Sequence, residues 1–470
     1  MFGKNKKNNS LDEQFIKAYN KIREKSKRKL LCHAPFSTLF FSEYGEILPC
    51  YYNKNIVFGR YPEQSPEEAW FGKKMNTLRE HIKNNDLSYG CQDCMQYLNS
   101  ENYYSVGAWK YDYLPVNKSK YPISLDFQIS NICNLSCIMC NGEYSQTVRQ
   151  KRENKDSYVN PYDENFIKKI EPFFPHLKEA AFTGGETFII KQYYDIWDKI
   201  LEINPKIRIS ITTNGTILNS KIKTYLDKLN FNITMSLDSI SKENFESIRR
   251  LSNFDNVLNN LDYYIEYTKR KQTLLTVKVC PMRQNWHEMP VLINFLNNKN
   301  VLFLFNNVVF PPYCSLWNLP SAKLKEVYEF IEKHEFATNT IIQKGNIERV
   351  DNLINQLKNW EKQAKEFENT YPDINSKSAN EINILLKQKI RYYLTTNTNI
   401  SASTSFGQDL EKVFDDLIIS IKDEKILKNA FIYFFKIPVH RILSEFNIRN
   451  FDKIVERTIQ AGYTEPPSIK

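Results

Sequence analysis

Residues 131–141 read NICNLSCIMCN and bring three cysteines, Cys133, Cys137 and Cys140, into one short segment. Thiolates are soft ligands, and clustered thiolates suit an iron–sulfur centre or zinc. Three thiolates are one ligand short of closing a four-iron cube or a tetrahedral zinc site. The pattern therefore predicts a metal centre with one open position for a substrate or cofactor.

A β-strand is expected directly before this segment. Residues 123–127 read ISLDF and alternate apolar and polar side chains, as a half-buried strand does. The cysteines then lie on a loop at the carboxyl end of a strand, where α/β sheets and barrels place their chemistry. Three buried free cysteines are the alternative, but their spacing within one loop favours a metal centre.

The C-x3-C-x2-C spacing after a strand resembles the signature of the radical S-adenosylmethionine (SAM) superfamily. In that family three cysteines hold a [4Fe-4S] cluster, and the SAM amino and carboxylate groups chelate the fourth iron. An electron from the cluster cleaves SAM to a 5′-deoxyadenosyl radical, which abstracts hydrogen from a substrate. The family usually has an aromatic residue before the third cysteine, near the adenine. Here Met139 stands there, and a thioether can pack on a ring.

A second family segment follows an apolar strand at residues 180–182. It reads TGGE, and two glycines after a strand let the backbone approach a ligand closely. The resemblance implies that Gly184, Gly185 and Glu186 hold the SAM amino group. From the residues alone, an ordinary strand-to-helix turn is the alternative. Thr187 replaces the proline that usually follows in the family.

Three further cofactor contacts are implied by the resemblance. Asn214 lies in a T-N-G segment that ends the strand at residues 207–213. Ser236 lies in S-L-D after the next strand, where related enzymes contact SAM. Arg249 is a basic residue downstream that can approach the SAM carboxylate, with a solvated helix arginine as the alternative.

Strand and helix signals alternate through residues 120–318, which is the α/β pattern. Further strands are expected at 275–279 and 301–305. We therefore predict an α/β fold, a partial (β/α)6 TIM-like barrel, with a small Cys-rich α+β module before it and helices after it. The predicted domains are a basic helix or tail (1–30), the Cys-rich module (31–115), the barrel (116–318) and a helical domain (319–470).

The Cys-rich module contains four cysteines, two of them a C-x2-C pair. Four thiolates fully ligate a [4Fe-4S] cluster or a structural zinc ion. The stretch resembles the twitch/SPASM-type module that carries an auxiliary [4Fe-4S] cluster in many radical SAM enzymes, although that module usually follows the SAM domain. The resemblance implies an auxiliary cluster, in preference to zinc, on Cys32, Cys50, Cys91 and Cys94.

Two cysteines remain outside both sets. Cys280 follows a predicted strand, and some radical SAM peptide epimerases use such a thiol to return a hydrogen atom to the substrate radical. Cys314 lies in a Pro-rich loop and is a candidate extra ligand. A buried, unreactive thiol is the preferred interpretation of both, because free cysteine behaves as a small hydrophobic residue.

Net charge, apolar content and cysteine number limit the partners and the compartment that we expect for this protein. The net charge is +10, but the lysines form no stripe beyond residues 4–29, so we do not expect a nucleic-acid partner. No apolar run is long enough to cross a membrane, and residues 1–7 do not read as a secretory signal, which predicts a cytoplasmic protein. Nine cysteines then indicate metal or redox chemistry rather than disulfides.

The predicted function is reductive SAM cleavage followed by hydrogen abstraction, supported by a small electron donor of the flavodoxin or ferredoxin type. A peptide or protein side chain is the preferred substrate, and a sugar or nucleotide-linked metabolite is the alternative. A metal-stabilised nucleic-acid-binding or redox-sensing protein is the alternative of another class.

Overall fold

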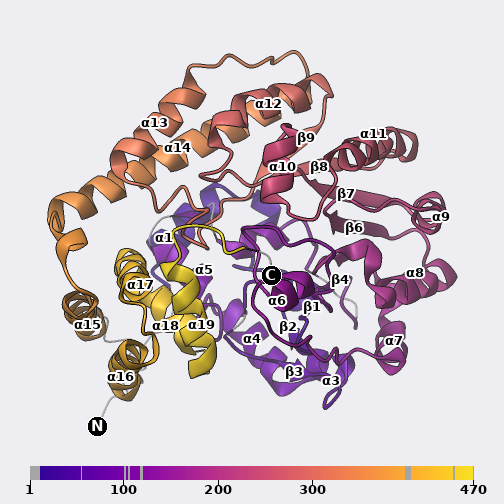
Figure 1. Cartoon of the computed structure of the whole chain (residues 1–470). Helices are drawn as coiled ribbons and strands as arrows, with labels where there is room; N and C mark the ends of the chain where they lie inside the picture. The colour runs from indigo at the N-terminus through magenta and orange to yellow at the C-terminus, as the bar shows by residue number, and fades with distance from the viewer. Residues whose placement is uncertain are drawn as a thin grey trace, which may run out of the picture. The chain divides into compact units, whose positions relative to one another are not determined.

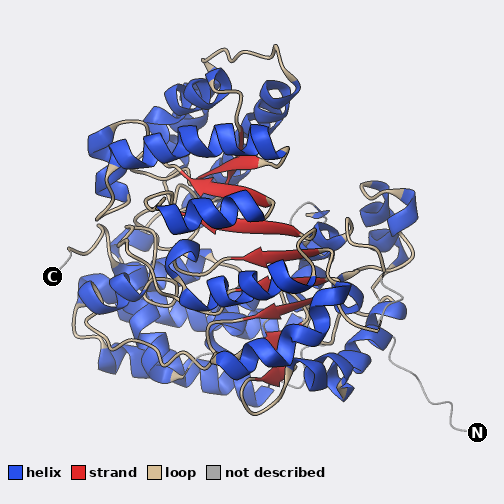
Figure 2. Cartoon of the chain, turned by 90° about the vertical axis from the view of Figure 1, so that its right-hand side faces the viewer, coloured by secondary structure: helices blue, strands red, loops and turns tan. Residues whose placement is uncertain are grey.

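The computed structural model describes residues 11–53, 55–99, 102–103, 106–116, 120–396, 404–447 and 450–468. The chain forms two compact units. The first consists of Met1–Asn134, Gly142–Met235 and Asn256–Leu275, and the second of Leu135–Asn141, Ser236–Asp255 and Thr276–Lys470. Helices and strands occur in both units. Figure 2 colours the helices blue and the strands red.

The first unit contains seven strands in the order β3-β2-β1-β4-β5-β6-β7 (Figure 1). Antiparallel pairs join β1 to β2 and β2 to β3, whereas β1, β4, β5, β6 and β7 run parallel. Their bounds are β1(Thr38–Phe41), β2(Glu46–Leu48), β3(Gly59–Arg60), β4(Ser124–Phe127), β5(Glu179–Phe182), β6(Arg208–Thr213) and β7(Phe231–Ser236). The Cys-rich hairpin therefore extends the parallel strands of the barrel.

An aromatic ladder explains this extension. Phe41 on β1 lies opposite Phe127 on β4, and Phe127 lies opposite Phe182 on β5. The ring centroids are 5.3 Å and 5.0 Å apart, and all three rings are buried. Aromatic pairs directly across neighbouring strands stabilise a sheet and pin its register. The sequence predicts the strands but not this pairing, because the partner of an edge strand depends on the folded chain.

Helices follow the parallel strands, and polar residues cap their first turns. Ser145, Asp163 and Asn219 each accept a hydrogen bond from a backbone N–H two or three residues into the helix that follows. The helices of this unit are α1(Glu13–Lys21), α2(Ala34–Ser37), α3(Pro66–Phe71), α4(Lys73–Lys83), α5(Gln92–Asn99), α6(Gln146–Lys151), α7(Glu164–Ile170), α8(Lys191–Ile203), α9(Ser220–Lys228) and α11(Phe254–Lys271).

Short 3-10 helices complete this unit, at Lys25–Lys27, Gly107–Tyr111, Glu171–His176 and Thr187–Ile189. Within residues 1–30, where a basic helix or tail is predicted, the described residues include helix α1 and two buried side chains. Tyr19 is fully buried, and the side chain of Arg23 is buried in an ion pair with Asp112. A paired, hydrogen-bonded guanidinium can be buried where an isolated one cannot.

The second unit contains the two remaining strands, β8(Leu275–Val279) and β9(Leu302–Phe305), which pair in parallel. The buried side chain of Asn346 lies beside β9. Its Oδ1 accepts from Phe303 N at 3.1 Å, and its Nδ2 donates to Val301 O at 2.9 Å. The side-chain amide thus forms hydrogen bonds with backbone groups that lack a partner strand at the edge of a sheet.

A helical region follows, as predicted. The helices of the second unit are α10(Lys242–Ile248), α12(Met289–Asn298), α13(Ser321–Glu332), α14(Ile341–Thr370), α15(Ala379–Thr396), α16(Thr404–Ser420), α17(Glu424–Lys436), α18(Val439–Asn447) and α19(Phe451–Gly462). Short 3-10 helices lie at Trp286–Glu288 and Ile374–Ser376. Apolar residues of α15 to α19, among them Leu386, Phe414 and Phe434, form one buried core. The five helices are labelled in Figure 1.

The fold is an α/β fold with a parallel sheet, as predicted for a partial TIM-like barrel. The six predicted barrel strands correspond to β4–β9. The exact domain boundaries remain a prediction. Among the described residues, no helix combines the length and apolarity needed to cross a membrane.

Candidate functional site

Three predicted ligands lie on the loop after β4. Cys133, Cys137 and Cys140 are all half-buried and in no disulfide. Cys133 belongs to the first unit, and the segment Leu135–Asn141 belongs to the second. Half-burial leaves each sulfur accessible to a ligand while the neighbouring backbone is anchored.

The glycine pair is a close-packing point for the chain that leads into Cys133. A Cβ on Gly184 would lie 2.4 Å from Ser130 O, and one on Gly185 would lie 2.0 Å from Ile132 O. Gly184 also has a φ of +106°, which L side chains rarely adopt. The backbone N–H of Gly185 also donates a hydrogen bond to Ser130 O at 3.0 Å. The two glycines thus allow close packing against the backbone that leads into Cys133, and this packing helps to position that cysteine.

Glu186 is fully buried, and the chain's own donors hold its carboxylate. It accepts from Thr213 Oγ1 at 2.7 Å, Asn214 N at 2.6 Å and Phe188 N at 3.1 Å. Its own N–H donates to Ile132 O at 2.7 Å. The carboxylate therefore ties the end of β5 to the end of β6, and its predicted contact with SAM remains a prediction.

Asn214 connects the end of β6 to the first cysteine. Its Nδ2 donates to Asn134 Oδ1 at 2.9 Å and lies 4.0 Å from Cys133 Sγ. Its Oδ1 accepts from Thr216 N at 3.0 Å. The hydroxyl of Thr147 also donates to Cys133 O. Asn214 is thus placed beside a predicted cluster ligand.

The other two cysteines lie in a hydrogen-bonded segment of the second unit. Cys140 N donates to Cys137 O at 3.0 Å, and Ile138 N donates to Ile248 O at 2.9 Å. Tyr313 OH donates to Ile138 O at 3.0 Å. Met139 packs, partly buried, on an apolar cluster whose members are Ile138, Ile248, Cys280, Met282, Val308, Tyr313 and Cys314.

Arg249 is buried, contrary to the solvated alternative. It pairs with the fully buried Asp238 at 2.8 Å, and its Nη1 lies 4.0 Å from Cys137 Sγ. Burial acts to lower the pKa of Arg249, but Asp238 and Cys137 outweigh it, so the pKa is raised. A permanent positive charge therefore stands beside a predicted ligand. Ser236, at the end of β7, is half-buried.

Cys280 and Cys314 are both buried in the apolar cluster around Ile138. Burial, with Asp238 next in effect, raises the pKa of Cys280 to about 12, so its thiol is protonated at neutral pH. Asn306 Nδ2 lies 3.6 Å from its sulfur, and Cys280 N donates to Asp238 Oδ1 at 2.7 Å. A hydrogen-donor role for Cys280 remains a prediction.

The four remaining cysteines all belong to the first unit. Cys32 precedes α2, Cys50 follows β2, and Cys91 and Cys94 lie at the start of α5. Burial raises the pKa of all four, to about 12 for Cys50 and about 11 for Cys94. Repulsion from the Cys50 and Cys94 charges adds to the rise at Cys32 and Cys91. Such thiols become thiolates only when a metal compensates their charge.

Donors surround these sulfurs. Backbone N–H groups of Ala34, Tyr52, Asn53, Gly107 and Ala108 hydrogen-bond to three of them. The Asn53 Nδ2 donates to Cys91 Sγ at 3.4 Å, and a Cβ on Gly90 would lie 2.7 Å from the Asn53 side chain. Hydrogen bonds to sulfur are a feature of iron–sulfur sites, so these residues fit a cluster.

The site thus has two thiol sets, one of three after β4 and one of four around the β1–β2 hairpin. These are the two sets of cysteines predicted to bind the SAM cluster and the auxiliary cluster. Residues 127–296 match the radical SAM superfamily model, and residues 32–95 match SPASM, an iron–sulfur cluster-binding domain. The chain therefore contains a radical SAM domain and, ahead of it, a SPASM domain, and the cofactors of these domains are SAM, a [4Fe-4S] cluster and an auxiliary iron–sulfur cluster.

Curated relatives include nucleotide cyclases. A probable GTP 3′,8-cyclase of Methanocaldococcus jannaschii is 28% identical over 172 residues, covering 37% of this chain and 54% of the relative. The GTP 3′,8-cyclase of Clostridium perfringens strain 13 is 26% identical over 156 residues, covering 32% and 46%. The chain spans about half the length of the curated relatives it matches.

Two solved structures are similar at a low level. The structure of anSMEcpe with bound AdoMet has 21% identity and a TM-score of 0.35, covering 45% of this chain and 58% of that one. Streptococcus suis SuiB bound to precursor peptide SuiA has 15% identity and a TM-score of 0.35, covering 61% and 54%. Similarity at this level carries no functional conclusion for this chain.

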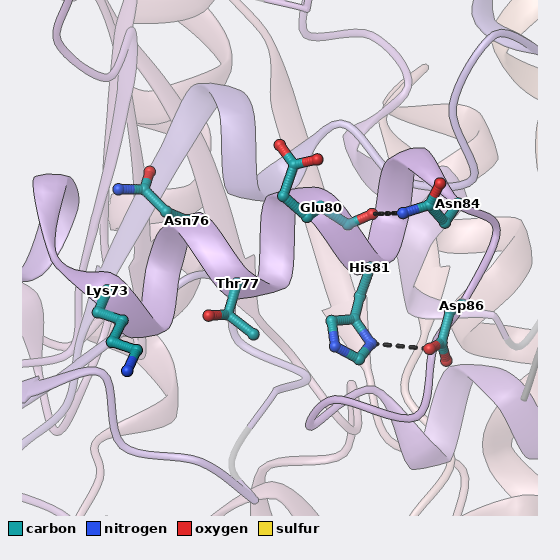
Figure 3. Close-up of a pocket in the computed structure, with 7 residues that line it drawn as sticks. All are labelled: Lys73, Asn76, Thr77, Glu80, His81, Asn84 and Asp86. Carbon is teal, nitrogen blue, oxygen red and sulfur yellow. Dashed lines mark hydrogen bonds and ion pairs between the residues drawn. The ribbon is translucent and has the colours of Figure 1, made fainter.

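A surface hollow of about 660 Å³ lies along α4 (Figure 3). His81 Nδ1 and Asp86 Oδ2 are 2.8 Å apart there, and Asn84 Nδ2 donates to Glu80 O at 2.9 Å. No predicted cluster or cofactor residue lines it; the lining residues are Lys73, Asn76, Thr77, Glu80, His81, Asn84 and Asp86. Among the residues described, no three His, Cys, Asp or Glu side chains are grouped to bind a single metal ion.

Two residues of these sites were missed by sequence reasoning. Asp238 holds Arg249, and its only sequence signal is its place in S-L-D. Tyr19 is buried in the unit that contains the four cysteines, and nothing in the basic, helical run around it indicates this.

Proposed function

We propose that this radical SAM enzyme oxidises a peptide or protein side chain after hydrogen abstraction. The observation that carries the proposal is the four-thiol site, with its N–H donors, inside the SPASM match. A fully ligated auxiliary site suits one-electron transfer, which a net oxidation requires. We further propose that a flavodoxin or ferredoxin type of protein supplies the initial electron and that the enzyme is cytoplasmic.

Each part of the chain has a separable task in this proposal. When bound, the cofactors supply hydrogen-atom abstraction at the three-cysteine site and one-electron transfer at the four-cysteine site. Cys133, Cys137 and Cys140 would hold the first cluster, with the backbone at Gly184 and Gly185 fixing the approach to Cys133. Arg249 would provide a fixed positive charge near Cys137 for an anionic group, such as the SAM carboxylate.

A nucleotide-linked substrate is the second candidate. The curated relatives named as GTP 3′,8-cyclases favour it. Their matched regions cover 37% and 32% of this chain, so most of the chain lies outside the comparison.

Anaerobic reconstitution tests the proposed radical SAM activity and the separate roles proposed for the three-cysteine and four-cysteine sites. We expect about eight iron atoms per chain and release of 5′-deoxyadenosine on addition of dithionite and SAM. Cys133→Ala should abolish release, whereas Cys32→Ala should retain release but lose substrate turnover. Cys314→Ala, at a buried thiol outside both sets, is the matched control and should keep full iron content. Equal loss of release in the Cys133 and Cys32 variants contradicts the proposal.

The substrate class is tested by product mass. The wild type is incubated with SAM and dithionite in the presence of either GTP or a mixture of synthetic peptides. Peptide products that have lost two hydrogens support the first proposal. A mass-shifted guanine nucleotide, with no change in any peptide, supports the second candidate instead.

A further inference from the structure

Tyr19 carries a buried hydroxyl with no hydrogen-bond partner among the described residues. The side chain lies on α1, is 0% exposed, and its OH has no hydrogen-bond partner in the described structure. Nearly all buried hydroxyls in folded proteins are paired, because an unpaired one loses its bonds to water. The hydroxyl therefore calls for a partner beyond the described residues, such as a bound group.

Tyr19 lies next to the four-cysteine site. Helix α1 packs against α5, which contains Cys94. Burial is the main cause of a raised pKa for the Tyr19 phenol, and the charges of Cys32 and Cys94 contribute to it. The phenol is therefore neutral, keeps its proton and lies within electrostatic reach of two predicted cluster ligands.

Arg23 holds the ring in place. Its guanidinium carbon is 4.8 Å from the centre of the Tyr19 ring. The guanidinium is itself fixed, because it donates to Asp112, to Asn20 Oδ1 at 3.0 Å, and to two backbone carbonyls. A cation over the face of an aromatic ring stabilises that arrangement. The Tyr19 ring thus packs against a guanidinium that is itself held in place.

We propose that the Tyr19 hydroxyl donates a hydrogen bond to a sulfur of the auxiliary cluster held by Cys32, Cys50, Cys91 and Cys94. The inference rests on the four-cysteine site of the proposed function. A hydrogen bond to sulfur stabilises the more negative, reduced cluster and so raises its reduction potential. Tyr19 lies outside the SPASM match at 32–95, so α1 becomes a functional part of the cluster module.

The test isolates the auxiliary cluster. Cys133, Cys137 and Cys140 are all replaced by Ala, the remaining cluster is reconstituted, and its reduction is followed by EPR at controlled potential. Adding Tyr19→Phe should lower the midpoint potential, with a tenfold change in the redox equilibrium corresponding to 59 mV for one electron. Tyr264→Phe is the matched control, because Tyr264 is also fully buried with an unpaired hydroxyl but lies by Glu186 and Tyr194.

A second readout separates a cluster contact from a packing role. In the metal-free wild-type background, Tyr19→Phe should not lower the melting temperature, since the hydroxyl has no partner there. In the cluster-loaded protein the same change should lower it. Equal destabilisation with and without the cluster, or a cluster of normal iron content with an unshifted potential, overturns the role of Tyr19. Failure of the triple variant to assemble any cluster overturns the four-cysteine assignment itself.

Discussion

The absence of a side chain at Gly185 is required by the close packing of the backbone around the candidate site. Because a Cβ there would lie 2.0 Å from Ile132 O, Gly185→Ala must displace the backbone that leads into Cys133. We expect a loss of unfolding free energy of about 2 kcal/mol or more, with reduced iron uptake at the three-cysteine site. Denaturant unfolding and iron analysis measure the two effects.

Gly345→Ala is the matched control for Gly185→Ala. Gly345 lies inside α14, and its added Cβ would meet only the end of the Arg349 side chain, at 3.2 Å. Alanine in a helix interior stabilises by roughly 0.5–1 kcal/mol relative to glycine. If the two variants lose the same stability, the close-packing account of Gly185 is wrong.

Asp238 and Arg249 form a second residue-scale prediction. Asp238 is fully buried and Arg249 is 8% exposed, so Asp238→Asn leaves a buried guanidinium without its charge partner. Breaking a buried pair in this way costs about 3 kcal/mol or more, which chemical denaturation of the metal-free protein can measure. The matched control is Asp255→Asn, which breaks the exposed Lys242–Asp255 pair. That change should cost less than about 1 kcal/mol, and a similar cost for both contradicts the prediction.

At the scale of elements, Lys389 joins α15 to the carboxyl end of α17. Its Nζ donates to Phe435 O at 2.6 Å and Ile437 O at 2.9 Å. Burial lowers the pKa of Lys389 from 10.5 to about 8. Between these pH values the unfolded chain binds a proton that the folded chain does not, so the stability of the wild type rises with pH across this window.

Lys389→Met removes this contribution. The unfolding free energy of the wild type relative to the variant should therefore increase by about 1 kcal/mol between pH 8 and pH 10.5. The value is below the full linkage figure because the side chain is only partly buried. Lys412→Met, at an exposed position on α16, should show no such change. If the difference in unfolding free energy between the wild type and Lys389→Met does not change across this pH window, the proposed link between Lys389 protonation and stability is wrong.

For the molecule as a whole, the auxiliary site links segments that are far apart in sequence. The four thiols come from the start of α2, the end of β2 and the start of α5. A cluster that binds only the folded chain stabilises it by mass action and closes long loops. Chelation should therefore lower the melting temperature of the Cys133/Cys137/Cys140→Ala triple variant by about 5 °C or more in a thermal unfolding experiment.

The control for chelation adds Cys50→Ser to the same triple variant. Losing a fourth ligand weakens the cluster, so the chelator should have a smaller effect on the melting temperature. An equal drop in both proteins means that the chelator acts elsewhere. That result removes the structural role of the four-cysteine site.

Local signals determined much of this protein. The ends of each predicted barrel strand lie within one or two residues of the ends of β4–β9. The reason is that the alternation of apolar residues along a strand indicates which of its side chains are buried. The cysteine spacings and the family resemblance identified a radical SAM domain and a SPASM domain, since ligand spacing along one loop is a short-range property. The helical region after residue 320 follows from the helical period of its apolar residues.

Only the tertiary structure decided which distant groups meet. The pairing of β1 with β4, the use of Glu186 as a link between strand ends, and the burial of Arg249 against Asp238 have no local signal. The same holds for Tyr19, whose basic, helical surroundings read as solvated until α1 packs on α5. The physical reason is that burial and charge pairing are long-range properties, set by which surfaces the folded chain brings together.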